Sequence, residues 1–316
     1  MPTAAKLKLA LAGIGKIAID QHLPSIAETG LFELAGVVSQ RGIAVPGIPT
    51  FRDQRELFAA IPDLAAVANC TPPHVRHGYA VEALEAGKHL LIEKPPTASI
   101  AELADMMSAA SKAKRSLFAT WHSRYNTAVE QAAAILRTRA IAAVTVTWKE
   151  DVRRWHPGQD WVFEPGGFGV FDPGINALSI VTAIMPYPVF VETAELHFPG
   201  NRATPIAVDL SLRGPAGSGL ASIACAFDWR QQGEQTWTIE VRLADGGSLT
   251  LTHGGTRLSV DGVATVSEPD SEYRRIYRRF HALVASGQSD VDASPLQLVA
   301  DAFMMGRRHE VAPFAW

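Results

Sequence analysis

The chain has 316 residues, of which 47% are hydrophobic and 19% are charged, and its formal net charge is -3. This length suffices for two domains of ordinary size, and so high an apolar content argues against a disordered chain. The charge leaves no basic surface for nucleic acid, and no apolar stretch reaches membrane-spanning length. We therefore expect a cytoplasmic globular protein without nucleic-acid, membrane or metal partners. Its two cysteines, Cys70 and Cys225, are expected to be small buried hydrophobic residues in a reducing compartment.

Residues 8–18 form the most informative stretch, a short apolar run followed by the pattern G-x-G-x-x-A. Gly13 permits a tight turn after a strand, and Gly15 allows backbone N–H groups to approach a pyrophosphate. Ala18 in the third position allows close helix–strand packing, so that the positive end of the next helix faces the anion. An ordinary structural turn is the alternative, but the preceding strand favours a dinucleotide site. The expected cofactor contacts at this turn are Gly13, Gly15, Lys16 and Ile17.

Strand-like and helix-like segments alternate from this turn to about residue 120. The predicted strands after the turn are residues 32–38, 64–70, 89–92 and 116–120, and the predicted helices are residues 17–27, 51–60, 74–87 and 101–114. Pro24 is expected to kink or shorten the first helix. Such alternation predicts a parallel, doubly wound α/β sheet, in which ligands bind outside the carboxyl ends of the strands.

The end of the second strand lacks the carboxylate that would bind the adenosine ribose 2′-hydroxyl of NAD. Ser39 and Arg41 stand there instead and could hold the 2′-phosphate of NADP, although Arg41 could equally be a solvated loop residue. We therefore expect the site to accept both NADP and NAD. The further cofactor contacts predicted at or after strand ends are Thr71, Pro72, His77, Glu93 and Lys94.

From about residue 126 the pattern changes to runs that alternate between apolar and polar residues, with glycine-rich turns between them. The predicted helices are residues 128–137, 271–286 and 295–308, and the predicted strands are residues 144–150, 191–197, 206–212, 218–229, 237–243 and 248–252. This pattern predicts an α+β domain with a large, mostly antiparallel sheet and helices on one face. The expected domains are residues 1–123 and 124–316. The broad sheet also leaves a face on which copies of the chain could associate into a homo-oligomer.

A polar, aromatic and glycine-rich segment lies early in the second half, at residues 148–157 and 166–176. Asp172 directly precedes a proline, so it could simply cap a helix. Asn176 follows four residues later, and this spacing would bring both polar side chains to the same side of the first helical turn. Lys94 is an equally suggestive residue, because it lies at a strand end where two following prolines stiffen the backbone.

Together these motifs resemble the glucose–fructose oxidoreductase and inositol dehydrogenase family. That family has an N-terminal Rossmann domain with G-x-G-x-x-G/A, a T-P strand end, the tripeptide E-K-P and a G-G-x-x-x-D-x-G-x-H segment. The matching pieces here are the glycine turn, Thr71-Pro72, Glu93-Lys94-Pro95 and residues 166–176. Asn176 departs from the pattern, since the family usually has histidine there, so the usual histidine acid/base is absent at that position.

Within the family, the sequence resembles bacterial aldose 1-dehydrogenases that act on L-arabinose or D-galactose. The resemblance implies oxidation of the pyranose at C1 to a lactone with NAD or NADP. That reaction needs a base for the C1 hydroxyl proton, and Asp172 is the best candidate once histidine is absent. Lys94 could lower the pKa of that hydroxyl or relay its proton, and Asn176 could hold the hydroxyl by hydrogen bonding. The side chains expected to contact the sugar, each of which could also be structural, are His122, Glu150, Trp155, His156 and Trp229.

Two other functions stay open at this point. The protein could oxidise a cyclitol or another ring carbon of a sugar, which would give a stable keto product instead of a lactone. It could also be a non-catalytic sensor that binds NADP, although the presence of both Lys94 and Asp172 argues against this.

Overall fold

The computed structural model describes residues 6–269 and 271–316, and these residues form two compact units. The first unit comprises the chain up to His122 and the later segment Glu272–Asp292, and the second comprises Ser123–Ser271 and Ala293–Trp316. The division after His122 lies beside the boundary expected at residue 123. The segment Glu272–Asp292 differs from the expectation, because it clusters with the first unit and not with the rest of the second half.

Within its described residues, the first unit contains a parallel sheet of six strands in the order β3-β2-β1-β4-β5-β6. The strands are β1 (Leu7–Ala12), β2 (Phe32–Val38), β3 (Thr50–Phe51), β4 (Ala66–Asn69), β5 (His89–Ile92) and β6 (Leu117–Ala119). All neighbouring strands run parallel, which confirms the predicted doubly wound sheet. The strand order reverses at β1, which pairs with β2 on one side and β4 on the other. From Leu9 onward β1 is fully buried, as expected for a central strand covered by helices.

The helices of the first unit follow the predicted order with changed boundaries. They are η1 (Ala18–His22), α1 (Leu23–Thr29), α2 (Gln54–Ala60), α3 (Pro73–Glu85), α4 (Ile100–Ala113) and, from later in the chain, α8 (Glu272–Ser286). The predicted first helix is divided into a π-helical turn, η1, and α1, and Pro24 occupies the first turn of α1, where proline is tolerated. α2 begins later than predicted because residues 50–51 pair with β2 and Asp53 caps the helix by accepting the Glu56 N–H at 2.9 Å.

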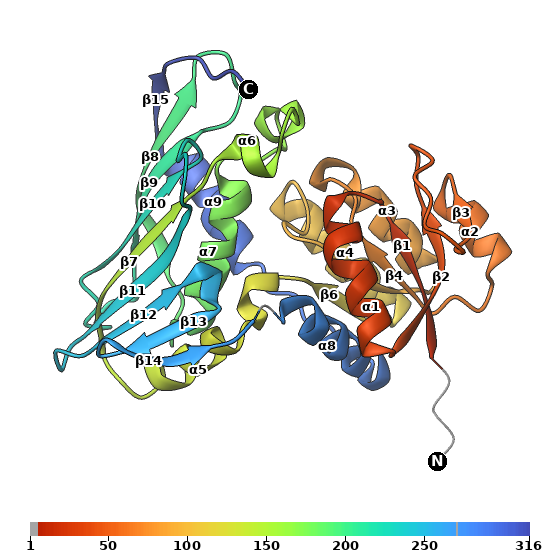
Figure 1. Ribbon diagram of the computed structural model, residues 1–316, viewed down its shortest axis with the longest axis horizontal. Helices are drawn as coiled ribbons and strands as arrows, with labels where there is room; N and C mark the ends of the chain where they lie inside the picture. Colours follow the sequence, from red (N-terminus) through yellow and green to blue (C-terminus); the bar gives the residue numbers. More distant parts are fainter. Residues whose placement is uncertain (1–5, 270) are drawn as a thin grey trace. The chain divides into compact units, whose positions relative to one another are not determined.

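The helix α8 and the residues after it complete the first unit. In Figure 1 this blue helix packs beside the red α1. Phe280 of α8 stacks on Phe32 of β2, with ring centroids 5.6 Å apart. Farther along, Asp290 forms a β-bridge with Phe118 of β6. Residues that the sequence assigned to the second domain therefore cover the core and an edge of the first sheet.

Among its described residues, the second unit contains a nine-stranded sheet in the order β14-β13-β12-β11-β7-β10-β9-β8-β15. The strands are β7 (Ile141–Lys149), β8 (Phe190–Pro199), β9 (Ala207–Arg213), β10 (Ser222–Asp228), β11 (Thr236–Leu243), β12 (Ser248–Thr252), β13 (Arg257–Val260), β14 (Val263–Ser267) and β15 (Arg307–Val311). The β7–β10 and β8–β15 pairs are parallel and the other neighbours are antiparallel. The predicted mostly antiparallel sheet is confirmed.

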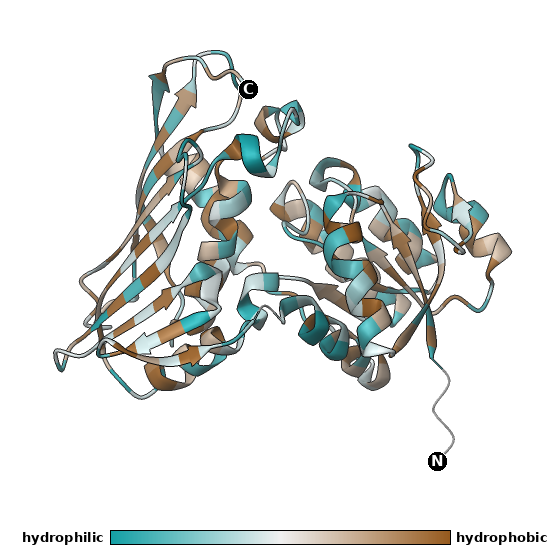
Figure 2. Cartoon of the chain, viewed as in Figure 1, coloured by the Kyte–Doolittle hydropathy of each residue, from teal (hydrophilic) through white to brown (hydrophobic). Residues whose placement is uncertain are grey.

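Helices cover one face of this second sheet. They are α5 (Thr127–Leu136), α7 (Phe171–Ile184) and α9 (Ser294–Met305), and Figure 1 shows α7 and α9 on the same side of the strands. Hydrophobic and hydrophilic residues alternate along the strands in Figure 2, which is typical of a sheet with one packed and one polar face. In the part of the chain that the structure describes, no helix is both long and apolar enough to cross a membrane.

Two features near the end of the chain depart from the sequence expectations. The last helix ends at Met305 instead of continuing to residue 308, because Gly306 adopts an extended conformation and residues 307–311 pair with β8. The hairpin of β13 and β14 was not predicted. Asp261 and Gly262 join its strands with positive φ at both residues, and an Asp-Gly pair is a strong hairpin signal that the sequence did contain.

The two cysteines are free thiols in the described structure. Cys225 is buried on β10, and this burial raises the pKa of its thiol to about 12. Cys70 directly follows β4 and is only half-buried, so the expectation of full burial holds for Cys225 but not for Cys70.

Candidate active site

The glycine turn after β1 has the geometry that a dinucleotide requires. Gly13 has φ +89°, and a Cβ there would lie 2.9 Å from backbone atoms of Cys70 and Thr71. At Gly15 a Cβ would meet nothing within 4 Å. Gly13 is therefore needed for the close approach of two strand ends, whereas Gly15 borders open space that a pyrophosphate could occupy. The residues present fit the nicotinamide dinucleotide that the motif predicts.

The two residues after Gly15 are exposed, in keeping with a binding surface. Lys16 forms an ion pair with Asp20 in the next turn, and Ile17 is exposed although it is apolar. The Ile19 N–H donates to the Gly15 carbonyl at 3.1 Å, so the helical turn begins directly after the glycine. The first helical N–H groups consequently lie next to the open space at Gly15.

Ser39 and Arg41, the two residues expected to bind a 2′-phosphate, differ in their surroundings on the loop after β2. Ser39 is buried, and its Oγ accepts the Ile43 N–H at 3.0 Å. Arg41 is exposed on the same loop. Ser39 thus stabilises the loop, whereas the side chain of Arg41 is open to solvent.

The loop after β4 is stabilised by hydrogen bonds to the side chain of Asn69, the last residue of that strand. The Asn69 Oδ1 accepts the Thr71 hydroxyl at 2.7 Å and the Thr71 N–H at 3.2 Å. Pro72 follows directly before α3 and is exposed. His77, farther along α3, lies 2.8 Å from Asp105 of α4. His77 therefore joins two helices, whereas Thr71 and Pro72 lie at the strand end where a cofactor contact was expected.

Arg76 links the loops that follow β4 and β5. This arginine is only 3% exposed, and its guanidinium donates to the main-chain carbonyls of Thr71, Glu93 and Pro95. The role of Arg76 could not be predicted from the sequence, because its acceptors are main-chain atoms, two of them far away in the sequence, and carry no residue pattern.

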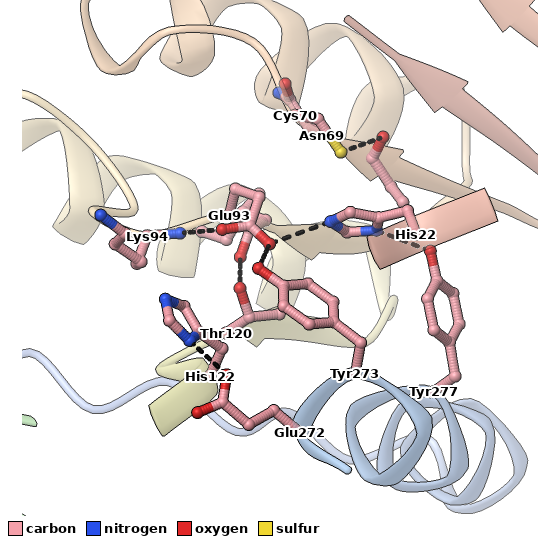
Figure 3. A network of polar contacts seen from close by, with 12 residues as sticks. His22, Asn69, Cys70, Glu93, Lys94, Thr120, His122, Glu272, Tyr273 and Tyr277 are labelled. Carbon is pink, nitrogen blue, oxygen red and sulfur yellow. Dashed lines mark hydrogen bonds and ion pairs between the residues drawn. The ribbon is translucent and has the colours of Figure 1, made fainter. Parts of the chain in front are cut away.

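The carboxylate of Glu93 lies in a buried polar network, shown in Figure 3. Its Oε1 lies 2.9 Å from the His22 Nε2 and accepts the Tyr273 hydroxyl at 2.8 Å, and its Oε2 accepts the Lys94 N–H at 3.0 Å. Burial opposes ionisation, but the hydrogen bond and positive charge of His22, with the charges of His122 and Arg76, lower the pKa of Glu93 to about 2. Glu93 is thus an ionised carboxylate next to Lys94.

His122 belongs to the same side of the first unit. Its Nδ1 lies 2.6 Å from Oε2 of Glu272, and its ring stacks on Tyr273 with centroids 5.7 Å apart. Burial lowers the pKa of His122, but the charge and hydrogen bond of Glu272, together with the charge of Glu93, outweigh burial and raise it. The first unit therefore brings together the E-K-P motif and one of the residues expected to contact the sugar.

In the second unit, Asp172 does not cap the helix α7. The helix begins at Phe171 with Val170 as its N-cap, and Asp172 lies within the first turn, where its N–H donates to Gly169 at 2.9 Å. The buried carboxylate lies 3.1 Å from the His156 Nε2. The simple capping interpretation of Asp172 is therefore wrong, because the helix starts two residues earlier than the proline suggested.

Glu150 and Trp229 stabilise the surroundings of His156. The Glu150 carboxylate accepts the Trp229 indole N–H at 3.1 Å and the Trp237 indole N–H at 2.9 Å. Trp229 is fully buried, and its ring lies against His156 with centroids 5.5 Å apart. Trp155 in turn packs on Trp237 at 5.7 Å. Trp237 was missed in the sequence because it lies on a regular strand, β11, outside the polar segment.

Two polar atoms of the expected sugar site are buried without a hydrogen-bond partner among the described residues. They are the Trp155 indole nitrogen, a donor, and the Asn176 side-chain oxygen, an acceptor. Buried polar groups in proteins are nearly always satisfied by protein, water or ligand. A donor and an acceptor of this kind suit hydroxyl groups, which can both donate and accept.

The segment that carries Trp155 and His156 is held by residues 314–316. The Trp316 indole N–H donates to Oδ1 of Asp160 at 2.8 Å, and the Arg153 guanidinium donates to the Ala315 carbonyl at 2.7 Å. Residues 315 and 316, which are distant in the sequence, therefore stabilise the segment expected to bind the substrate.

Comparison with known proteins matches residues 7–120 to an oxidoreductase family with an NAD-binding Rossmann fold. A galactose 1-dehydrogenase from Pseudomonas fluorescens is 42% identical over 98% of both chains. The solved structure of a D-galactose-1-dehydrogenase protein from Rhizobium etli is 48% identical, covers both chains completely and superposes with a TM-score of 0.94. A 3-ketoreductase from Actinomadura kijaniata, solved with NADP, has a TM-score of 0.82 over 97% of this chain and all of its own, but at 18% identity it shows the fold alone.

These similarities extend over both units, so they include the glycine turn, the E-K-P motif and the substrate segment. They confirm the resemblance that the sequence motifs indicated. The chain belongs to the glucose–fructose oxidoreductase and inositol dehydrogenase family of oxidoreductases with an NAD-binding Rossmann fold.

Proposed function

We propose that the protein is an aldose 1-dehydrogenase that oxidises D-galactose, and also L-arabinose, at C1 to the aldonolactone with transfer of hydride to NAD(P)+. The observation that carries the proposal is the similarity over the full length to galactose 1-dehydrogenases from two bacteria. L-Arabinose is included because it shares the ring stereochemistry of D-galactose.

The glycine turn would hold the dinucleotide by its pyrophosphate, and the bound nicotinamide would supply the hydride acceptor. The open space at Gly15 and the helical N–H groups after it hold the pyrophosphate. Arg41, exposed on the loop after β2, binds the 2′-phosphate of NADP. The same loop has no carboxylate to select the free 2′-hydroxyl, so both NADP and NAD serve as acceptors.

Asp172 is the base that takes the proton from the C1 hydroxyl. His156, at 3.1 Å, orients its carboxylate. Lys94 stabilises the negative charge that develops on the hydroxyl oxygen, and Asn176 holds the same group by hydrogen bonding. Asn176 cannot itself accept and keep a proton, because an amide does not titrate near neutral pH.

The sugar is recognised by the polar atoms that the second unit leaves unsatisfied. The Trp155 indole N–H donates to one hydroxyl and the Asn176 oxygen accepts from another. Glu150 and Trp229 contribute indirectly to sugar binding. Glu150 holds the ring of Trp237 by a hydrogen bond, and Trp229 packs against the ring of His156. His122 is a further side chain proposed to contact the sugar.

An aldose panel assayed with each nicotinamide cofactor tests the proposal. D-Galactose and L-arabinose should give reduced cofactor and a lactone that hydrolyses to the aldonic acid. A stable keto product would instead indicate oxidation at another ring carbon or of a cyclitol. Binding of NADP without turnover of any sugar would identify a sensor.

The assembly and location of the protein stay predictions. Light scattering of the purified full chain tests the homo-oligomer expected from the exposed face of the nine-stranded sheet. Fractionation of cells tests the cytoplasmic location.

A further inference from the structure

The main chain at Lys94 is fixed by the side chain of the residue before it. The Oε2 of Glu93 accepts the Lys94 N–H at 3.0 Å, and Arg76 holds the carbonyls of Glu93 and Pro95. A carboxylate bonded to the next N–H restricts the torsion angles between the two residues. The direction in which the Lys94 side chain leaves the backbone therefore depends on where the Glu93 carboxylate lies.

Two side chains from distant elements determine the position of that carboxylate. His22 ends the helical turn η1 that follows the glycine motif, and Tyr273 lies in the first turn of α8. Both bond the same oxygen of Glu93, at 2.9 and 2.8 Å. Figure 3 shows the three side chains pointing toward one another, with Tyr277 behind His22. The Tyr277 hydroxyl lies 2.7 Å from His22 Nδ1, so the histidine is held from its other side as well.

Burial makes this arrangement sensitive to the loss of one partner. Glu93 and Tyr273 are each 3% exposed and His22 is fully buried. A buried carboxylate that loses a donor either finds another one or moves, because an unpaired buried charge is strongly disfavoured. A shift of Glu93 is passed directly to the Lys94 N–H.

We propose that Glu93 is a positioning residue for Lys94, that His22 and Tyr273 hold it in place, and that α8 thereby forms part of the catalytic machinery. The proposal rests on the function proposed above, in which Lys94 acts on the C1 hydroxyl. It gives a chemical reason why the chain returns to the first unit with α8, since that helix supplies a donor to the catalytic motif. It also ties the cofactor turn to the catalytic lysine through His22.

Tyr273→Phe and Glu93→Gln test the proposal in the full-length enzyme. Each variant should lower kcat by about tenfold to a hundredfold, as expected when a catalytic group is displaced by a fraction of an ångström to 1 Å. The sugar KM and the Kd for NADP should stay within about twofold of wild type, because both side chains are buried and bonded to each other. With a sugar deuterated at C1, the isotope effect on kcat should rise as the chemical step becomes slower. A purely structural role would lower Tm but leave kcat per folded molecule and the isotope effect unchanged.

Two further tyrosine variants serve as controls. Tyr277→Phe removes a hydroxyl that contacts His22 but not Glu93, so its loss of kcat should be smaller than that of Tyr273→Phe. Tyr187→Phe, in the loop between α7 and β8 of the second unit, should behave as wild type. Wild-type kcat in Tyr273→Phe and Glu93→Gln would overturn the proposal while leaving the proposed function intact. Wild-type protein that reduces neither cofactor with any aldose would overturn the proposed function, and the positioning role with it.

Discussion

At the scale of single residues, Asp172 is a polar residue near the start of a helix that does not act as its N-cap. A cap lies before the first helical residue and accepts an N–H of the first turn. Asp172 lies inside the first turn of α7, and its carboxylate is buried next to His156. The positive end of the helix stabilises a negative charge at this position. This position agrees with the role of general base proposed above.

Replacing Asp172 by alanine should lower kcat by about a hundredfold or more, because the proposed general base is lost. Cofactor affinity should be nearly unchanged. Asn176→Ala should lower kcat by about tenfold, the value of one neutral hydrogen bond in the transition state. Steady-state kinetics and Tm measured on the same preparation separate catalysis from folding. Full activity per folded Asp172→Ala molecule would make Asp172 structural and leave Lys94 as the base.

Arg41→Ala should weaken NADP binding more than NAD binding, because only NADP carries the 2′-phosphate. Loss of a hydrogen bond to a charged group predicts an increase in the Kd for NADP of about tenfold to a hundredfold. Fluorescence titration with each cofactor measures the difference. Arg52→Ala, another exposed arginine of the first unit, is the matched control. Equal losses with both cofactors would remove Arg41 from the phosphate site.

At the scale of elements, the contact of η1, β5 and α8 through Glu93 predicts how stability depends on pH. The pKa of Glu93 is lowered to about 2 in the folded protein, against about 4.3 in an unfolded chain. A lowered carboxyl pKa stabilises the folded state above the unfolded pKa, and this contribution is lost as the pH falls from about 4.3 toward about 2. Over that range His22 stays protonated. Burial lowers its pKa, but the interactions with Cys70, Tyr277 and Glu93 together outweigh burial and raise the pKa well above its usual value.

Urea unfolding between pH 6 and pH 3 measures this effect. The wild-type free energy of unfolding should fall below about pH 4.3 more steeply than that of Glu93→Gln, which has no carboxyl group to titrate there. Glu85→Gln, at the exposed end of α3, should follow the wild-type curve. Parallel curves for wild type and Glu93→Gln would show that this ion pair does not govern the acid limit.

Residues 314–316 contact Arg153 of α6 (Val152–Trp155) and Asp160. We expect the loss of these contacts to weaken sugar binding and to leave cofactor binding unchanged. Trp316→Ala removes the indole N–H that Asp160 accepts, so the segment should lose order around Trp155. We expect the sugar KM to rise about threefold to tenfold, the value of about one weakened hydrogen bond. The Kd for NADP should not change. Met304→Ala, which removes an exposed apolar side chain of the same unit, should leave both values at wild type, and an unchanged KM in Trp316→Ala would show that these contacts are dispensable.

The sequence predicted those elements whose signals are local. The alternation of strands and helices up to residue 120 and the apolar–polar alternation later in the chain both led to the observed sheets. Helix ends were less predictable, because Gly306 and the start of α7 depend on neighbouring strands and turns. The hairpin at Asp261-Gly262 was missed although its signal is present.

The candidate site was predictable only for residues inside a motif. Lys94 and Asp172 lie in recognisable patterns. Arg76, Tyr273 and Trp237 do not, since their partners are distant in the sequence and become neighbours only through the fold. No local pattern of residue types marks such contacts, because tertiary packing creates them.

At the scale of the whole molecule, the cofactor unit is not one continuous stretch of chain. A fragment that ends at residue 123 lacks α8, so Phe32 loses its stacking on Phe280 and Glu93 loses Tyr273. We expect this fragment to unfold without a cooperative transition and to bind NADP weakly. Joining residues 271–292 to it through a flexible linker should restore both properties, as measured by circular dichroism and fluorescence titration. Cooperative folding of the shorter fragment would contradict this.

The discontinuous first unit also has a consequence for synthesis on the ribosome. At about 5–20 residues per second, the strands β1–β6 emerge on the order of ten seconds before α8 does. During that interval the aromatic surface around Phe32 and Phe118, which Phe280 covers in the finished protein, has no partner from α8. We therefore expect the first unit to complete its folding only after residues 272–292 have left the ribosome. Until then, we expect the nascent chain to expose this aromatic surface and to be a substrate for chaperones.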